Sequence, residues 1–347
     1  MKVIIDAFGG DYSPDEMVKG AIIAVNQNKD LDVILTGKKD VLEQKIAEIS
    51  LLDEFKLQSK ERLSIIDAAE VITCEDKPTE AIRSKKDSSL VKAFEELKKT
   101  EDAIAVISAG STGAVLTGAF MKIGRIKGVS RPTLCPALPT AKGTPVVLID
   151  SGANMDCKPL NLIHFAVMGN EYYKSMFGNS NPRVAILNVG AEDEKGNELV
   201  KKTLPYLRQL NINFVGSMEA RDFLSGDYDV VVCDGFAGNT LLKGCEGAVT
   251  TVVSLIKNAL KSGGVLTKVG AGLIKKPLKN VLKKFDYTNY GGSPFLGVSK
   301  TVIKVHGNSK CNNIVEAVKQ AIMLQENKCN ENVKLALDSL TIELPQD

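Results

Sequence analysis

Short apolar runs that end in small or polar residues recur along this chain and alternate with longer segments of helical periodicity. This rhythm is typical of the βα units of a parallel sheet, whose strands are buried on both faces and therefore read as continuous Val- and Ile-rich runs. The runs predict strands at residues 2–8, 31–36, 103–108, 145–150, 183–189 and 228–233. Ligands of open parallel sheets collect beyond the carboxyl ends of the strands, so we expect the site residues in the loops that follow these runs.

The domain prediction is a single catalytic α/β unit spanning residues 1–347. A chain of this length with 44% hydrophobic residues can fill one large core. No internal repeat, low-complexity tract or linker rich in Pro, Gly and Ser marks a boundary. We therefore expect a doubly wound body with a less regular insertion.

Charge and cysteine content narrow the class of protein. The chain has 44 basic and 42 acidic side chains, and a net charge of +2 is too small for a general nucleic-acid binder, so electrostatic recognition must be local. Its seven cysteines show no C-x-x-C pairing and are expected to be reduced thiols of a cytoplasmic protein. The N-terminal segment lacks a secretory signal pattern, and no apolar run is long enough to span a bilayer, which leaves contact with a membrane surface open.

Two glycine-rich loops follow predicted strands. The first contains Asp6, Gly9 and Gly10, which would let the backbone approach a ligand closely or would simply form a tight turn. The second, SAGSTGA, would leave backbone N–H groups free to hold an anion or would only pack closely on the sheet. Its candidate binding residues are Ser108, Gly110, Thr112 and Gly113. The spacing matches neither a dinucleotide fingerprint nor a P-loop, so it predicts a phosphate-sized site without a nucleotide.

Residues 75–90 bring cations and hydroxyl groups together around a predicted helix. Arg83, Lys85 and Ser88 are candidates for holding a tetrahedral oxyanion, since cationic heads beside hydroxyl groups suit such a ligand. A solvated basic helix surface is the ordinary alternative.

Three further loops are dense in polar residues, which are unusual in mere connections. Their candidate binding residues are Asp150, Gly152 and Asn154 in the first, Asn188 and Gly190 in the second, and Asp234, Gly235 and Gly238 in the third. The second loop also contains Lys195. The third also contains Asn239, which can stabilise an oxyanion or can simply cap the helix that follows. A metal cluster of Asp150, Asp156 and Asp234 is not favoured, because oxygen-only sites have no diagnostic spacing and lysines would compete with the ion.

The chain has two histidines, and neither lies near an obvious nucleophile, so a hydrolase triad is not expected. His306 follows a predicted strand and is a candidate for bonding substrate, whereas His164 on a predicted helix reads as a core histidine.

Glycines, leucines and lysines crowd together at residues 253–285. Leu266, Val269, Leu273 and Ile274 fall at helical spacings with lysines between them, which suits reversible contact with a lipid surface. Packing in a dimer or in the core is the alternative, and Pro277 should break or kink the helix.

Eight segments resemble, in sequence order, the successive signatures of the bacterial phosphate acyltransferases that make acyl phosphate from acyl-carrier-protein thioesters for phospholipid synthesis. The segments are IDAFGGD, PTEAIRSKKDSSL, SAGSTGA, DSGAN, LNVGAEDEKGNE, DGFAGN, YGGSPFLGV and VHGNS, and they run from Met1 to about Lys319. The resemblance implies a three-layer α/β/α fold with a mostly parallel sheet, akin to phosphotransacetylases and isopropylmalate dehydrogenases. It also implies a homodimer that needs neither metal nor other cofactor.

The same resemblance implies the substrates and the catalytic residues. Long-chain acyl-acyl-carrier protein and inorganic phosphate would react to give acyl phosphate, with Lys195 and Asn239 as the catalytic candidates. Because acyl phosphate is labile, a membrane-bound glycerol-3-phosphate acyltransferase is an expected partner. The alternative hypotheses are a short-chain acyl-coenzyme A phosphate transacylase, a metal-dependent hydroxyacid dehydrogenase and a non-catalytic acyl- or phosphate-sensing module.

Overall fold

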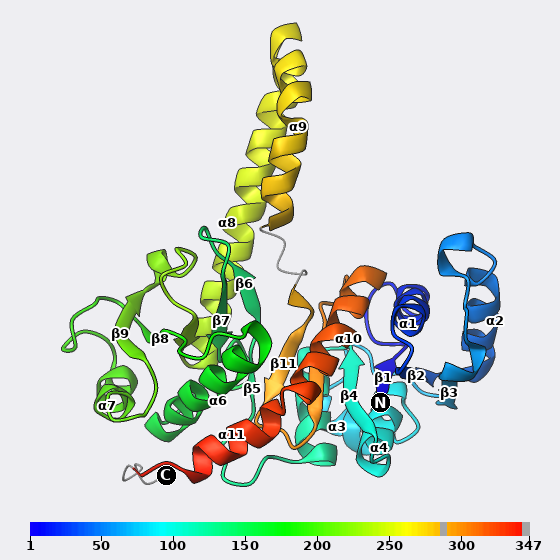
Figure 1. The fold of residues 1–347 in the computed structure, drawn as a ribbon, viewed down its shortest axis with the longest axis horizontal. Coiled ribbons are helices and arrows are strands. Elements are labelled where there is room, and N and C mark those ends of the chain that lie inside the picture. The colour runs from blue at the N-terminus through cyan, green and yellow to red at the C-terminus, as the bar shows by residue number, and fades with distance from the viewer. Residues whose placement is uncertain (285–289, 342–347) are drawn as a thin grey trace.

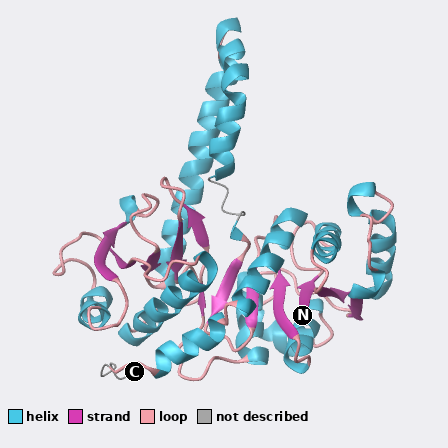
Figure 2. Cartoon of the chain, viewed as in Figure 1, coloured by secondary structure: helices cyan, strands magenta, loops and turns pink. Residues whose placement is uncertain are grey.

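The computed structural model describes residues 1–284 and 290–341 of the chain. Its strands form two sheets that lie side by side, each covered by helices (Figure 1, Figure 2). The α/β class and the parallel-rich sheets agree with the prediction. The parallel strands form two such sheets, with the cavity described below between them.

The larger sheet has seven strands in the order β3-β2-β1-β4-β12-β11-β5. Neighbouring strands from β3 to β12 in this order are parallel, whereas β11 is antiparallel to both of its neighbours. The strands are β1 (Lys2–Asp6), β2 (Asp32–Gly37), β3 (Leu63–Asp67), β4 (Ala103–Ser108), β5 (Thr133–Leu134), β11 (Ser293–Leu296) and β12 (Thr301–Lys304).

Both faces of this sheet are buried, as the continuous apolar runs predicted. Val3 and Ile5 of β1 lie in a cluster with helices α1 and α10 on one face, and Ile4 between them lies in a cluster with α4 and α5 on the other. Side chains alternate across a strand, so a run without polar residues fits only such a sandwiched position. The surrounding helices are α1 (Asp15–Gln27), α2 (Lys39–Ile49), α3 (Pro78–Ser84), α4 (Ser89–Lys99), α5 (Thr112–Gly118) and α10 (Cys311–Glu326).

The smaller sheet has five strands in the order β6-β7-β10-β8-β9, parallel except for β6. Its strands are β6 (Ala137–Pro139), β7 (Pro145–Ile149), β8 (Val184–Asn188), β9 (Phe214–Glu219) and β10 (Val230–Val232). Helices α6 (Pro159–Phe177), α7 (Glu198–Leu207) and α11 (Cys329–Asp338) share a core with one face. Leu296 of β11 and Leu324 of α10 belong to that same core, so elements of the larger sheet help to close the smaller one.

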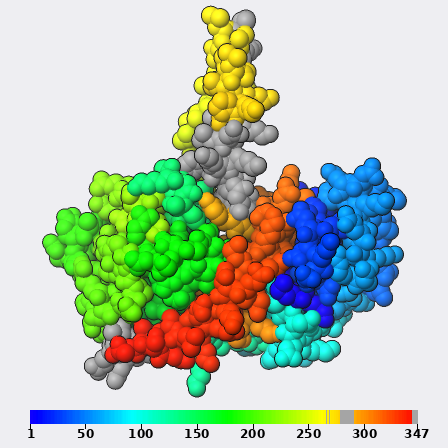
Figure 3. Space-filling model, in the orientation of Figure 1, coloured from blue at the N-terminus to red at the C-terminus, as the bar shows by residue number. Residues whose placement is uncertain are grey.

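A helical hairpin projects from the body of the molecule (Figure 1, Figure 3). It consists of α8 (Gly235–Ser262) and α9 (Val265–Lys284), joined at Gly263 and Gly264. The predicted helical segment at 253–285 is therefore only the outer part of a longer unit, and Phe285 lies outside the described residues. The expected break at Pro277 is not observed, because α9 continues through it.

Candidate active site

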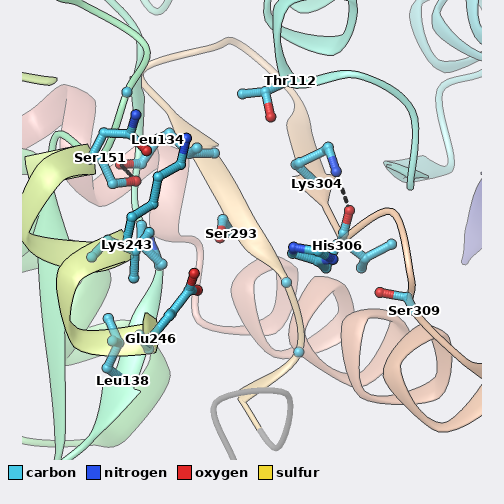
Figure 4. Close-up of a pocket in the computed structure, with 18 of the residues that line it drawn as sticks. Thr112, Leu134, Leu138, Ser151, Lys243, Glu246, Ser293, Lys304, His306 and Ser309 are labelled. Carbon is cyan, nitrogen blue, oxygen red and sulfur yellow. Dashed lines mark hydrogen bonds between the residues drawn. The ribbon is translucent and has the colours of Figure 1, made fainter. Parts of the chain in front are cut away.

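A cavity of about 340 Å³ lies between the two sheets, at the carboxyl ends of strands from both (Figure 4). Thr112, Lys304, His306 and Ser309 line one wall, and Ser151, Asn239, Lys243 and Glu246 line the opposite one. The cavity thus lies where loops that follow strands meet, and these are the loops in which we predicted the site residues. Of the predicted site residues, the binding candidates Thr112, Gly152 and His306 and the catalytic candidate Asn239 line the cavity.

The loops after β1, β4 and β12 are joined tightly beneath the first wall. The buried Asp6 carboxylate accepts a hydrogen bond of 2.7 Å from Ser108 Oγ, which in turn accepts one of 3.0 Å from the Gly110 N–H. Burial raises the pKa of Asp6, against the opposing effect of hydrogen bonds from Ser108 and Ser89. The Asp6 and Ser108 side chains therefore point toward each other and hold the loops after β1 and β4 together.

Gly9 and Gly10 allow these loops to approach. A Cβ atom on Gly9 would lie 2.6 Å from the Gly110 nitrogen, and Gly10 adopts a φ of +105° against the loop of Gly307. Close backbone approach thus explains both glycines, and it serves packing between loops. Gly113 is explained in the same way, since a Cβ there would lie 2.8 Å from the Pro78 ring.

The second wall is built on the loop after β7. The Asp150 carboxylate accepts hydrogen bonds from the N–H groups of Leu134 at 3.0 Å and Asn154 at 2.6 Å, while burial raises its pKa. The Asn154 carbonyl accepts the Gly235 N–H at 2.8 Å, and a Cβ on Gly238 would overlap the Asp150 carbonyl oxygen. These contacts seat the start of α8 on the loop.

Asn239 faces the cavity from the second turn of α8. The helix is capped by Asp234, whose Oδ1 accepts the Ala237 N–H at 2.8 Å, so the alternative that Asn239 is the cap was wrong. Asn239 packs beside Gly152, where a Cβ would lie 3.5 Å from the asparagine side chain. The Asn239 side chain thus lies on the cavity surface, beside the loop after β7.

Residues 75–90 do not reach this cavity. Lys85 forms an ion pair of 2.6 Å with Asp76, and the Ser88 hydroxyl donates to the Lys85 carbonyl at 2.7 Å. The neighbouring Ser89 is the residue that bonds Asp6. Arg83 lines another cavity, of about 530 Å³, with Arg125 and Arg131. A phosphate-binding role for Arg83, Lys85 and Ser88 stays a prediction.

Lys195 lies on the other side of α8 from the first cavity. Its ammonium pairs with Glu192 at 2.8 Å, and that hydrogen bond raises the pKa of Lys195. Asn188 donates to the Lys195 carbonyl at 3.2 Å, and Gly190 leaves space for the lysine stem. The loop borders a third cavity, whose lining includes Asn188, Gly196 and Phe236. The structure therefore does not bring Lys195 into the cavity that contains Asn239.

The sequence reasoning missed Lys304, Ser309, Ser151 and Lys243 on the cavity walls. The segment VIKVHGNS, which places a lysine just before the predicted His306, was the available signal for two of them. His164 is buried and accepts the Ser130 N–H at 3.0 Å, as expected of a core histidine. Chemically, the cavity offers cations and neutral donors on facing walls, an arrangement that suits an anion beside a polarised carbonyl.

Comparison with known proteins places this arrangement in a family. A family model described as "Fatty acid synthesis protein" matches residues 1–332. The chain is 45% identical to a phosphate acyltransferase of Thermoanaerobacter pseudethanolicus, covering 99% of both chains. It is 47% identical to a phosphate acyltransferase of Caldanaerobacter subterraneus subsp. tengcongensis, covering 96% of both.

Solved structures support the fold. A phosphotransacetylase from Streptococcus pyogenes aligns with a TM-score of 0.58 at 16% identity, covering 98% of this chain and 94% of that one. A branched-chain phosphotransacylase from Enterococcus faecalis V583 aligns with a TM-score of 0.56 at 13% identity, covering 93% and 98%. The near-complete match to curated relatives, on a fold of this type, shows that the chain belongs to the phosphate acyltransferase family of acyl-transferring enzymes.

Proposed function

We propose that this enzyme transfers a long-chain acyl group from acyl-acyl-carrier protein to inorganic phosphate, giving acyl phosphate for phosphatidic acid and phospholipid synthesis. The observation that carries the proposal is the cavity between the sheets, where the Asn239 amide and the cation Lys304 lie on facing walls. Membership of the phosphate acyltransferase family supports acyl transfer as the reaction. The description of the family model supports a place in fatty acid metabolism.

The chemistry needs little from the protein beyond placement and charge. A thioester is an activated acyl donor, and its thiolate leaves without strong acid assistance because thiols have a pKa of about 8.5. The enzyme must hold phosphate against the carbonyl, offset repulsion between negative charges and stabilise the tetrahedral oxyanion. In this proposal the Asn239 amide donates to the thioester oxygen. Lys195, in the loop between β8 and α7, orients a substrate.

Trapping the product tests the reaction. The enzyme is incubated with phosphate and with acyl-carrier-protein or coenzyme A thioesters of several chain lengths, and acyl phosphate is captured as the hydroxamate with hydroxylamine. Long-chain acyl-carrier protein should be the best donor. Preference for short-chain coenzyme A thioesters would favour a short-chain acyl-coenzyme A phosphate transacylase. Tight binding of the thioester without any hydroxamate would favour a sensing module.

We further propose that the α8–α9 hairpin serves the assembly of the enzyme at a membrane. Val252 and Leu255 of α8 and Val269 and Leu273 of α9 are more than half exposed, which is unusual for large apolar side chains on a projecting unit. Within the described residues no helix combines the length and apolar content needed to cross a bilayer. A reversible surface contact, near the membrane-bound glycerol-3-phosphate acyltransferase that would use the product, fits these side chains, and pairing with a second subunit is the alternative.

Flotation with anionic liposomes separates these outcomes. Leu273→Glu should abolish flotation, whereas Leu51→Glu, at an equally exposed leucine of the body, should leave it intact. If neither the unmodified enzyme nor the control floats, the membrane contact is wrong. Conversion of a dimer to a monomer by Leu273→Glu, measured by light scattering, would assign the hairpin to subunit pairing.

A further inference from the structure

Lys304 ends β12, and its side chain lies on the wall of the cavity between the sheets (Figure 4). Its backbone is held on both sides, because Lys304 pairs with Ser108 of β4 and with Ser293 of β11. The ammonium group is therefore positioned by the interior of a sheet, which defines its place more firmly than a loop would.

The ammonium group has capacity for another ligand. Its Nζ donates to the Val305 carbonyl and lies 3.5 Å from the Ala109 carbonyl, and in the described part of the chain it forms no ion pair. A lysine ammonium has three donors, and partial charges on carbonyls do not neutralise it. The cation is thus anchored by carbonyl oxygens, and no carboxylate in the described part of the chain pairs with it directly.

The other cations near the site differ from Lys304. Lys195 is half exposed, already paired with Glu192 at 2.8 Å, and absent from the lining of this cavity. Lys243 lines the opposite wall from α8, but it is exposed. Lys304 alone among these three is partly buried, held by a strand and unpaired.

Charge and burial around Lys304 favour an anionic ligand. Burial lowers the pKa of Lys304 to about 8, while the nearby Cys74 and Asp11 side chains oppose that shift electrostatically. His306 lies on the same wall, and Lys243 and Glu246 face it from α8. A partly desolvated cation is stabilised most by a ligand that brings full negative charge and several acceptor oxygens.

We propose that Lys304 binds the attacking phosphate, with the hydroxyl groups of Thr112 and Ser309 on the same wall as further donors. This rests on the proposed function. One phosphate oxygen attacks the thioester carbonyl carbon, and the C–S bond then breaks with its electron pair remaining on sulfur. The proton of hydrogen phosphate is transferred to the thiolate, and Lys304 keeps its own proton while it offsets negative charge.

The test compares Lys304→Met and Lys304→Arg with a matched control, Lys300→Met. Lys300 also donates to backbone carbonyls, of Leu97 at 2.7 Å and Thr100 at 2.9 Å, but does not line the cavity. Lys304→Met should raise the KM for phosphate about 10- to 100-fold, as loss of a charged hydrogen bond does, with Lys304→Arg closer to the unmodified enzyme. Lys300→Met should leave that KM unchanged.

Two measurements keep the test decisive. Inorganic phosphate alone should raise the melting temperature of the unmodified enzyme and of Lys300→Met, but not of Lys304→Met, whether or not acyl transfer occurs. An unchanged KM for phosphate in a folded, active Lys304→Met overturns the role of Lys304 and leaves the proposed function standing. Phosphate binding that depends on Lys304, without hydroxamate formation, overturns the proposed function and leaves the phosphate site standing. If Lys304→Met does not fold, Lys304→Gln takes its place, since its amide can still donate to the backbone carbonyls but carries no charge. The same rise in the KM for phosphate is expected, and an unchanged KM overturns the inference.

Discussion

Asn239 and Lys195 illustrate what residue-level reasoning can and cannot supply. The two were paired by resemblance, yet the structure places them on different sides of α8, with Asn239 in the cavity and Lys195 bound to Glu192. Loop composition showed which residues can carry chemistry. It could not show on which side of a helix a loop would lie, because that depends on packing between elements far apart in the chain.

At Asn239 we expect the loss of a transition-state donor to dominate. Asn239→Ala should lower kcat about 100-fold or more with little change in fold, as removal of an oxyanion donor does. Steady-state kinetics with acyl-carrier-protein thioester would measure it, with Asn332→Ala on α11 as the control. Near-normal turnover would refute the role of Asn239.

At Lys195 we expect a loss of turnover of the same size as at Asn239, and the matched control is its ion-pair partner Glu192. Lys195→Ala should also lower turnover about 100-fold if this lysine orients a substrate. Glu192→Gln removes only the partner charge, so it should keep most of the activity. Equal losses in both variants would instead indicate that the ion pair merely shapes the loop.

At Lys304 a stability measurement complements the kinetics. The folded-state pKa of about 8 lies below the ordinary 10.5, so protonated Lys304 destabilises the fold fully below pH 8 and progressively less as the pH rises to 10.5. Lys304→Met should therefore raise the free energy of unfolding at pH 7 by roughly 1–3 kcal/mol, since one pKa unit corresponds to about 1.4 kcal/mol and lost carbonyl contacts offset part of the gain. Denaturant titrations at pH 7 and pH 10 would show the difference shrinking at the higher pH.

At the scale of the element, the apolar runs predicted six strands to within two residues at every end, and the bounds of Ala103–Ser108 match the prediction at both ends. Strands β3, β5, β6, β9 and β11 were not among the predicted runs. Of these, β5 and β6 have only two or three residues, which carry no measurable periodicity, and β6 ends in Pro139. The helix after the Asp234 loop was predicted, and the lysine-rich segment that follows was recognised by composition. That the two form one projecting hairpin was not predicted, because it depends on how the helices pack.

Glycines in α8 provide a sharp test of this element. Gly238→Ala should destabilise the enzyme by about 1–3 kcal/mol, because the added Cβ would overlap the Asp150 carbonyl and displace the loop from the helix. Gly244→Ala, in the same helix with nothing near its Cβ, should be neutral or stabilising by up to about 1 kcal/mol. Thermal unfolding of the two variants would check the contrast, and equal effects would contradict it.

At the scale of the whole molecule, two sheets share their closing elements. Leu296 and Leu324 belong to the core of the smaller sheet although β11 and α10 pack with the larger one. Sequence patterns predicted six of the strands but not which strands pair, so the division into two sheets, and the cavity that it creates, could not be predicted from the chain alone.

We propose from this sharing that the predicted single domain is also a single folding unit. Unfolding followed by far-ultraviolet circular dichroism and by tyrosine fluorescence should give coincident transitions, because neither sheet can lose α10 without exposing apolar surface. Two separated transitions would mean two domains.

The helix α8 runs without interruption from the floor of the cavity to the tip of the hairpin. From Asn239 to Ser262 it spans about 35 Å, at roughly 1.5 Å per residue. Because no break interrupts the helix, a tilt imposed on its far end would move the asparagine amide as well. A partner that tilts the tip would thereby also reorient the asparagine amide at the base.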